Sequence, residues 1–135
     1  MPPSLPSQVK AFLDTWTDCP NKEAFVDLAS EVTGQSDISL DFKARPGVSY
    51  SLRASRQGQT DDLFCMIDVI DDDPEDRWLS VCFFAQMISD PEEMGDIVPG
   101  GLLGQDGYCF DLDRSVSDDA VYIRNRIREA YANCL

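Results

Sequence analysis

Two apolar runs of strand length stand at the centre of the hydrophobic pattern. They cover residues 63–70 and 78–85 and flank a very acidic turn at 71–77. Both runs are rich in Val, Ile, Phe and Cys, and Pro74 in the turn opposes a continuous strand, so the pattern predicts a β-hairpin. Neither run alternates cleanly between apolar and polar residues. Since strands that are apolar on both sides lie inside a sheet, we expect this hairpin to be central and covered on both faces over part of its length.

Two segments upstream, 38–44 and 48–56, alternate strictly and predict a second hairpin. A two-residue loop between them would match polar positions to apolar ones. A three-residue loop at 45–47 instead pairs Ala44 with Val48 and gives Gly47 the left-handed conformation, so that the apolar side chains of both strands share one face. The opposite face is polar and carries Ser39, Asp41, Lys43, Ser49, Ser51, Arg53 and Ser55.

Apolar residues at helical spacing predict amphipathic helices at 8–19, 22–33 and 118–133. A fifth strand is expected at 107–113, and a one-turn helix should begin at Asp90, where a proline and two acids follow. The residues expected to begin or end the longer helices are Ser7, Asn21 and Ser117 as N-caps and Gly34 as a left-handed C-terminal stop.

This order of elements predicts one α+β domain over 8–135, after a short disordered lead-in at 1–7. The fold is a two-layer, five-stranded, mainly antiparallel meander sheet with two N-terminal helices and one C-terminal helix on one face, in the order α-α-β-β-β-β-short α-β-α. The element order and the acidity resemble small bacterial α+β binding domains of the type III secretion chaperone kind. The C-terminal strand–turn–helix loosely resembles the sensory regulators related to them. This resemblance covers architecture alone, and it implies a homodimer that binds a segment of another protein.

The net charge limits the classes of partner, and the cysteines indicate the cellular compartment. A net charge of −14 argues against nucleic acid and anionic membranes as partners, and it favours solubility and permits attraction to a basic protein partner. No apolar run approaches the ~20 residues that span a membrane, and the N-terminal residues lack the pattern of a secretory signal. Without any C-x-x-C pair, the cysteines predict reduced, mostly buried thiols and a cytoplasmic location. These cysteines are Cys19, Cys65, Cys82, Cys109 and Cys134.

The chain contains no histidine, which excludes Ser-His-Asp and Cys-His catalysis and every His-ligated metal site. The acidic turn fails the EF-hand pattern because Asp76 stands where glycine is needed and Cys82 where the closing glutamate belongs. The glycine-rich stretch 100–105 lacks the lysine of a phosphate-binding P-loop. We therefore expect no catalytic residue, no metal ligand and no cofactor.

The function that fits best is a small, non-catalytic protein-binding module, similar to a chaperone, an adaptor or an immunity protein, and a homodimer is compatible with it. Its contact surface would be the apolar, glycine-rich segment 86–106. This segment either folds over a sheet edge as core cover or offers a sticky surface to a partner. The candidate partner-binding residues are Met94, Ile97, Val98, Leu102 and Leu103.

The alternative is a small-ligand-binding or enzymatic domain with a pocket between the sheet and the 86–106 segment. Its candidate ligand or anion residues are Lys43, Arg53, Arg56 and Asp68. The three basic residues form the most basic patch of an acidic chain. Asp68 sits in an apolar run, where burial would shift the pKa of its carboxyl group. The same residues are compatible with a solvated sheet face that carries a diagonal Asp41–Arg53 pair and an exposed or arginine-paired Asp68.

Overall fold

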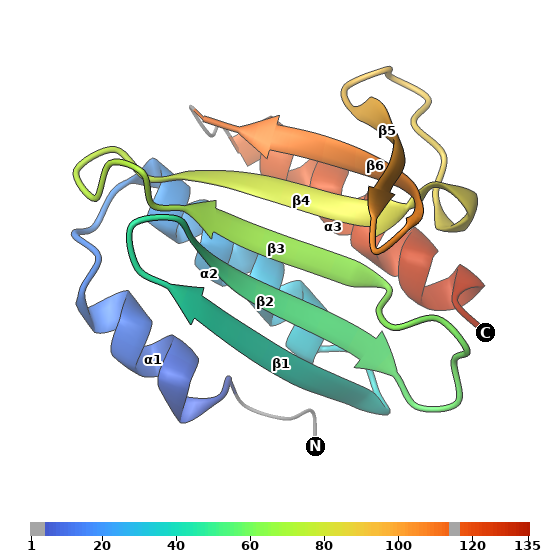
Figure 1. Ribbon diagram of the computed structural model, residues 1–135, viewed down its shortest axis with the longest axis horizontal. Helices are drawn as coiled ribbons and strands as arrows, with labels where there is room; N and C mark the ends of the chain where they lie inside the picture. Colours follow the sequence, from blue (N-terminus) through green and yellow to red (C-terminus); the bar gives the residue numbers. More distant parts are fainter. Residues whose placement is uncertain (1–4, 114–116) are drawn as a thin grey trace.

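The computed structural model describes residues 5–113 and 117–135, without the side chains at 117 and 118. The part described is an α+β fold with three α-helices and a six-stranded antiparallel sheet in the order β1-β2-β3-β4-β6-β5 (Figure 1). The strands are β1 (Ile38–Arg45), β2 (Ser49–Arg56), β3 (Cys65–Ile70), β4 (Trp78–Phe84), β5 (Asp96–Leu102) and β6 (Gln105–Leu112). The helices are α1 (Ser7–Asp14), α2 (Pro20–Thr33) and α3 (Ser117–Asn133), with a 3-10 turn η1 at Ala85–Met87. No helix among the described residues is long and apolar enough to cross a membrane.

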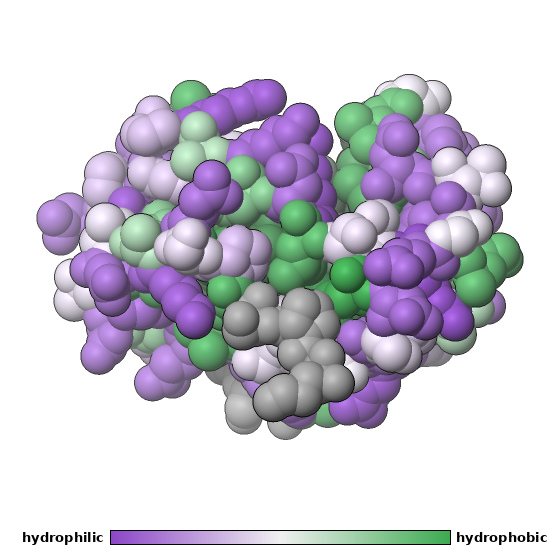
Figure 2. All heavy atoms as spheres, turned by 90° about the horizontal axis from the view of Figure 1, so that it is seen from below, coloured by the Kyte–Doolittle hydropathy of each residue, from purple (hydrophilic) through white to green (hydrophobic). Residues whose placement is uncertain are grey.

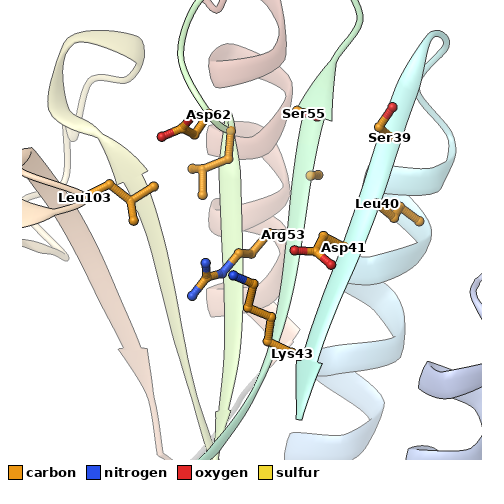
Figure 3. Close-up of a pocket in the computed structure, with 10 residues that line it drawn as sticks. Ser39, Leu40, Asp41, Lys43, Arg53, Ser55, Asp62 and Leu103 are labelled. Carbon is orange, nitrogen blue, oxygen red and sulfur yellow. The ribbon is translucent and has the colours of Figure 1, made fainter.

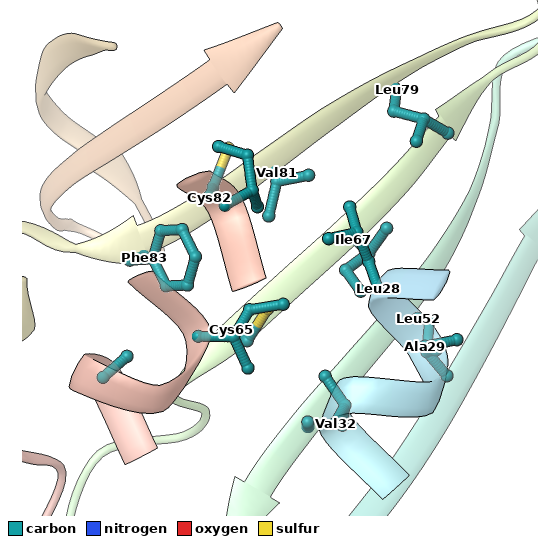
Figure 4. Close-up of a cluster of buried hydrophobic side chains, with 14 of the residues drawn as sticks. Leu28, Ala29, Val32, Leu52, Cys65, Ile67, Leu79, Val81, Cys82 and Phe83 are labelled. Carbon is teal, nitrogen blue, oxygen red and sulfur yellow. The ribbon is translucent and has the colours of Figure 1, made fainter. Parts of the chain in front are cut away.

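The expected central hairpin is confirmed, because β3 and β4 occupy the two middle positions of the sheet. Helices α2 and α3 cover one face of these strands, and α1 lies beside β1 (Figure 1). Figure 4 shows the resulting core, in which side chains of α2 meet those of β2 and β3. Leu28, Ile67 and Leu79 in this core are all at most 1% exposed, so the burial of the sheet's helix-covered face is the main source of stability.

The hairpin β1–β2 keeps the predicted faces but not the predicted register. Arg45 pairs with Ser49 and Ala44 with Tyr50, so the three-residue loop is Pro46-Gly47-Val48 rather than 45–47. The shift is two residues, which leaves every side chain on its predicted face. Gly47 has the expected positive φ of 84°, whereas Val48 sits in the turn with 59% of its surface exposed.

The helix boundaries correct three predicted caps. Helix α1 already includes Ser7 and ends at Asp14, and α2 begins at Pro20. Asn21 therefore lies inside α2, where its buried amide donates to the backbone carbonyls of Arg77 and Asp113 at 2.9 and 3.0 Å. Gly34 ends α2 with φ of −74°, so it is not left-handed.

Two predictions at the termini concern residues that are only partly described. Of the expected lead-in at 1–7, residues 1–4 lie outside the described part, while Leu5 packs against the core. The expected cap at Ser117 concerns a side chain that also lies outside it.

The 86–106 segment contains the sixth strand, which the sequence did not predict. Strand β5 pairs with β6 from Asp96↔Cys109 to Leu102↔Gln105, with an irregularity between Val98 and Leu102. No helix forms at Asp90; instead its carboxylate accepts hydrogen bonds from the backbone N–H groups of Met94 and Gly95 at 3.0 and 2.9 Å. A carboxylate that satisfies loop amides in this way replaces the helical turn that the sequence indicated.

The cysteines overturn the expectation of five reduced thiols. Cys82 and Cys109 are direct partners on β4 and β6, with Cα atoms 4.2 Å apart, and they form a disulfide. The free cysteines are Cys19, Cys65 and Cys134, of which the last two are buried. Burial raises the pKa of the Cys65 thiol far above its usual range, and the nearby charge of Asp68 adds to that rise. This thiol is therefore protonated and unreactive at neutral pH.

Candidate functional site

The candidate site lies on the sheet face that α2 and α3 leave open. Strict alternation places Lys43, Ser51 and Asp68 next to one another on neighbouring strands, because Lys43 pairs with Ser51 and Ser51 with Asp68. Two residues further along the strands, on the same face, Asp41 pairs with Arg53 and Arg53 with Met66. The predicted polar face of β1–β2 thus continues onto β3 as a floor of mixed charge.

A pocket of about 340 Å³ opens above this floor, between the β1–β2 strands and the tip of the β5–β6 hairpin. Lys43 and Arg53 point into it from one side and Leu103 faces them from the other (Figure 3). Its full lining is Ser39, Leu40, Asp41, Lys43, Arg53, Ala54, Ser55, Asp62, Leu63 and Leu103. Seen from below, the same region is a notch between the hairpin and the rest of the open face (Figure 2).

Neither cation of the pocket forms a salt bridge with a described carboxylate, although the charge of Arg53 acts on Asp68. The ion pairs in the described part of the chain use Lys22, Arg77, Arg124, Arg126 and Arg128. Arg53 donates from Nε to the hydroxyl of Ser51 at 3.2 Å, which leaves the rest of its guanidinium free to face the pocket. The expected Asp41–Arg53 pair is directly opposed in register instead of diagonal, and no salt bridge joins the two side chains.

Asp68 lies in the floor beside the pocket, on the open face of the sheet and opposite Ser51. Burial raises the pKa of Asp68, and a hydrogen bond from Ser51 and the charges of Arg53 and Arg45 pull it back only in part. Its Oδ1 is buried and has no hydrogen-bond partner among the described residues. A carboxyl group in this environment is stabilised by protonation or by an additional hydrogen-bond donor.

Arg56 does not join this group. Its side chain belongs to the helix-covered side, where Nη1 donates to the backbone carbonyl of Tyr131 at 3.1 Å. The guanidinium also lies 4.2 Å from the centre of the Tyr131 ring, so it stacks on α3. Of the four predicted ligand residues, the structure therefore brings Lys43 and Arg53 together, places Asp68 beside them and separates Arg56.

The tip of the β5–β6 hairpin supplies the apolar wall of the pocket. Leu103 and Gly104 form its two-residue turn with φ of 51° and 84°, the signs of a type I′ turn, and 50% of the Leu103 surface is exposed. The side-chain amide of Gln105 donates to the carboxylate of Asp61 at 3.1 Å, and this hydrogen bond connects the hairpin tip to the loop before β3. Among the predicted partner-binding residues Leu102 is buried at 3% exposure, whereas Met94, Ile97, Val98 and Leu103 are exposed.

Asp90 fixes the base of the same hairpin. The hydroxyl of Tyr108 on β6 donates to its Oδ2 at 2.8 Å, and the hydroxyl of Tyr122 on α3 donates to its Oδ1. Burial alone would raise the pKa of Asp90, but these bonds and those from Gly95 and Met94 outweigh burial and lower it to about 2. The sequence suggested a helix cap here, because nothing local reveals that two distant tyrosines converge on this carboxylate.

The arrangement is suited to recognition through charge and apolar contact. No group of three His, Cys, Asp or Glu side chains in the described part of the chain is placed to hold a metal ion. No family model matches this sequence, and comparisons with curated proteins and with solved structures found no match either. The function must therefore be argued from the site itself.

Proposed function

We propose that this protein is a non-catalytic protein-binding module that holds a carboxylate-bearing, partly apolar segment of another protein on its open sheet face. The observation that carries the proposal is the convergence of Arg53 and Lys43 in one pocket opposite Leu103. The carboxylate would bind between the two cations, and the adjoining apolar side chains would contact the hairpin tip.

The electrostatic support comes from two like charges that face one space in an acidic chain. The protein has 25 acidic and 11 basic residues, so acidic partners for surface cations are plentiful. Even so, Lys43 and Arg53 form no salt bridge with any described residue, although Asp41 and Asp62 line the same pocket. Their repulsion is relieved when an anion sits between them, and arginine is well suited to grip a carboxylate in bidentate fashion.

The apolar support comes from the exposed side chains of the 86–106 segment. Ile97 and Leu103 are 58% and 50% exposed, and Met94 and Val98 are 42% and 40% exposed. Ile97 pairs with Tyr108 and so lies on the helix-covered side of the sheet, whereas Leu103 at the hairpin tip lines the pocket. An exposed apolar side chain beside two cations is suited to contact a partner. A partner that brings both a carboxylate and an apolar neighbour would use both walls.

A small carboxylic acid is the second candidate, and the pocket volume of about 340 Å³ favours it, since ligand pockets begin near ~300 Å³. The wide notch and the apolar side chains beyond the pocket favour the longer ligand, because a small acid would leave those contacts unused.

The test is a display screen of random peptides on the immobilised protein, followed by affinity measurements on the selected peptides. We expect an enrichment of Asp, Glu or a free C-terminus next to a large apolar residue. Arg53→Gln should weaken binding about tenfold or more because a charge-assisted hydrogen bond is lost. Arg45→Gln is the matched control because Arg45 lies outside the pocket lining and should leave the affinity unchanged. Two outcomes would contradict the proposal: selected peptides whose affinity is unchanged by Arg53→Gln, or a protein that binds only small acids such as succinate.

A further inference from the structure

The two edges of the sheet differ in how readily they can accept another strand. Strand β5 is a poor template, because Pro99 lacks an N–H, Gly100 has φ of 64° and the pairing is irregular between Val98 and Leu102. Strand β1 is eight residues long and regular, and among the described elements it pairs with β2 alone. A regular unpaired edge of this kind offers a row of free backbone donors and acceptors.

The pairing pattern shows which residues of β1 face outward. The N–H of Gln57 donates to the carbonyl of Asp37 at 2.7 Å, which continues the β1–β2 register by one step. Hydrogen-bonded pairs alternate along an antiparallel ladder, so Ser39, Asp41 and Lys43 direct their backbone groups at β2. The backbone groups of Leu40, Phe42 and Ala44 therefore point to the free edge.

We propose that β1 pairs with β1 of a second copy of this chain, antiparallel and centred on Phe42. In this register Phe42 pairs with its own symmetry mate and Leu40 with Ala44, so the outward backbone groups of these three residues are used, while those of Ile38 at the start of the strand are left without a partner. Asp41 then lies opposite Lys43 of the second copy, twice by symmetry, in non-hydrogen-bonded positions where side chains approach most closely. A shift of two residues in either direction along this edge would place Lys43 opposite Lys43 or Asp41 opposite Asp41.

The apolar side of β1 is complementary in the same register. A groove of about 450 Å³ runs between α1 and the edge of β1 and is lined by Gln8, Ala11, Phe12, Thr15, Phe42, Ala44 and Tyr50. The partner's Leu40 would lie opposite the small, exposed Ala44, at the mouth of this groove. A large residue opposite a small one beside an apolar hollow fills space that water otherwise occupies. Charge and shape thus select the same pairing.

This inference does not rest on the proposed function of the open-face pocket. Asp41 and Lys43 belong to both surfaces, whereas Arg53 lies one strand further in and takes no part in the β1–β1 contact, and Ala44 lies outside the pocket lining. Loss of dimerisation and loss of ligand binding can therefore be told apart by comparing changes at Ala44 with changes at Arg53.

Sedimentation velocity over a concentration series tests the pairing. The wild-type chain, 15.1 kDa as a monomer, should reach twice that mass. Asp41→Lys or Lys43→Asp should each weaken the dimer about 30-fold, because two ion pairs change to repulsion together. The double variant should dimerise again, and the two single variants mixed together should form a heterodimer, since every charge then meets its opposite.

Two further variants separate the edge contact from folding. Ala44→Pro removes an outward N–H that no described strand uses, so it should abolish the dimer while the thermal midpoint stays close to that of the wild type. Arg53→Gln should leave the dimer unchanged. A wild-type chain that stays monomeric at high concentration overturns the inference, as does a dimer that survives both charge reversals and Ala44→Pro.

Discussion

Removing the carboxylate of Asp71 should destabilise the fold more than any other single change at a turn. Asp71 is 3% exposed and accepts from Nε of Arg77 at 2.7 Å and from the N–H of Gly47 at 2.8 Å. It therefore connects the β1–β2 turn to the β3–β4 turn. Asp71→Ala breaks both connections with one substitution.

The magnitude follows from what is left behind. Arg77 is 8% exposed and lies 5.1, 5.8 and 5.6 Å from the ring centres of Phe12, Trp16 and Tyr50. Without its partner this guanidinium is an uncompensated buried charge, and breaking a buried pair from one side costs about 3–5 kcal/mol. Replacing both partners avoids that charge, so Asp71→Ala combined with Arg77→Met should be less destabilised than Asp71→Ala alone.

Urea unfolding of the wild type, both single variants and the double variant measures these costs in one thermodynamic cycle. Burial alone would raise the pKa of Asp71, but the bonds from Gly47 and Arg77 outweigh it and leave the pKa below its usual range. The stabilisation is thus present above about pH 4 and is lost as the pH falls below it. A loss below about 1 kcal/mol in Asp71→Ala, or a double variant as unstable as the sum of the single ones, would refute the reasoning.

Three further predictions concern single sites. Because the pKa of Asp90 is lowered to about 2, the stabilisation from its ionised form, about 1 kcal/mol for a carboxylate this well screened by solvent, should be present above about pH 4 and disappear towards pH 2, a loss that Asp90→Asn should not show in urea titrations. A Cβ on Gly95 would lie 2.7 Å from an aromatic carbon of β6, so Gly95→Ala should cost about 1–3 kcal/mol by overpacking, whereas Gly47→Ala meets open space and is strained only by its φ of 84°. Reduction of Cys82–Cys109, which are 27 residues apart, should lower the unfolding free energy by about 3.5 kcal/mol, measured in urea with and without a phosphine reductant.

The sequence was most informative wherever one face of an element is apolar. Alternation in 38–44 and 48–56 predicts that Lys43 and Arg53 share the polar face, and its absence in 63–70 and 78–85 predicts that this hairpin is central, because burial acts on each strand separately. The same alternation could not fix the β1–β2 loop, since a shift of two residues preserves both faces. Val48 was therefore read as a strand residue although it lies in the turn.

The parts of the fold that the sequence does not predict depend on contacts between segments that are distant along the chain. Strand β5 contains Val98-Pro99-Gly100, which reads as a loop, and it is a strand only because β6 returns beside it. That return also places β6 against β4, which brings Cys109 opposite Cys82. Neither the disulfide nor the hairpin wall of the pocket can be read from spacing along the chain. Arg56 is close to Arg53 in sequence, but its even position in β2 turns it to the helix-covered face, so the two side chains do not share a site.

The net charge of the chain affects the two proposed ligand classes, a small acid and a segment of another protein, in different ways. With a net charge of −14, the protein repels a free anion at long range, and this repulsion opposes binding of a small acid at low ionic strength. The local attraction of Lys43 and Arg53 acts only once the carboxylate is already in the pocket. The proposed segment of another protein would be brought there by its remaining contacts, above all those with Leu103 at the hairpin tip, and it could carry positive charge elsewhere that the acidic surface attracts. The site therefore favours a longer ligand in which one carboxylate is embedded among apolar and basic residues, and salt should strengthen the binding of a small acid while it weakens that of such a segment.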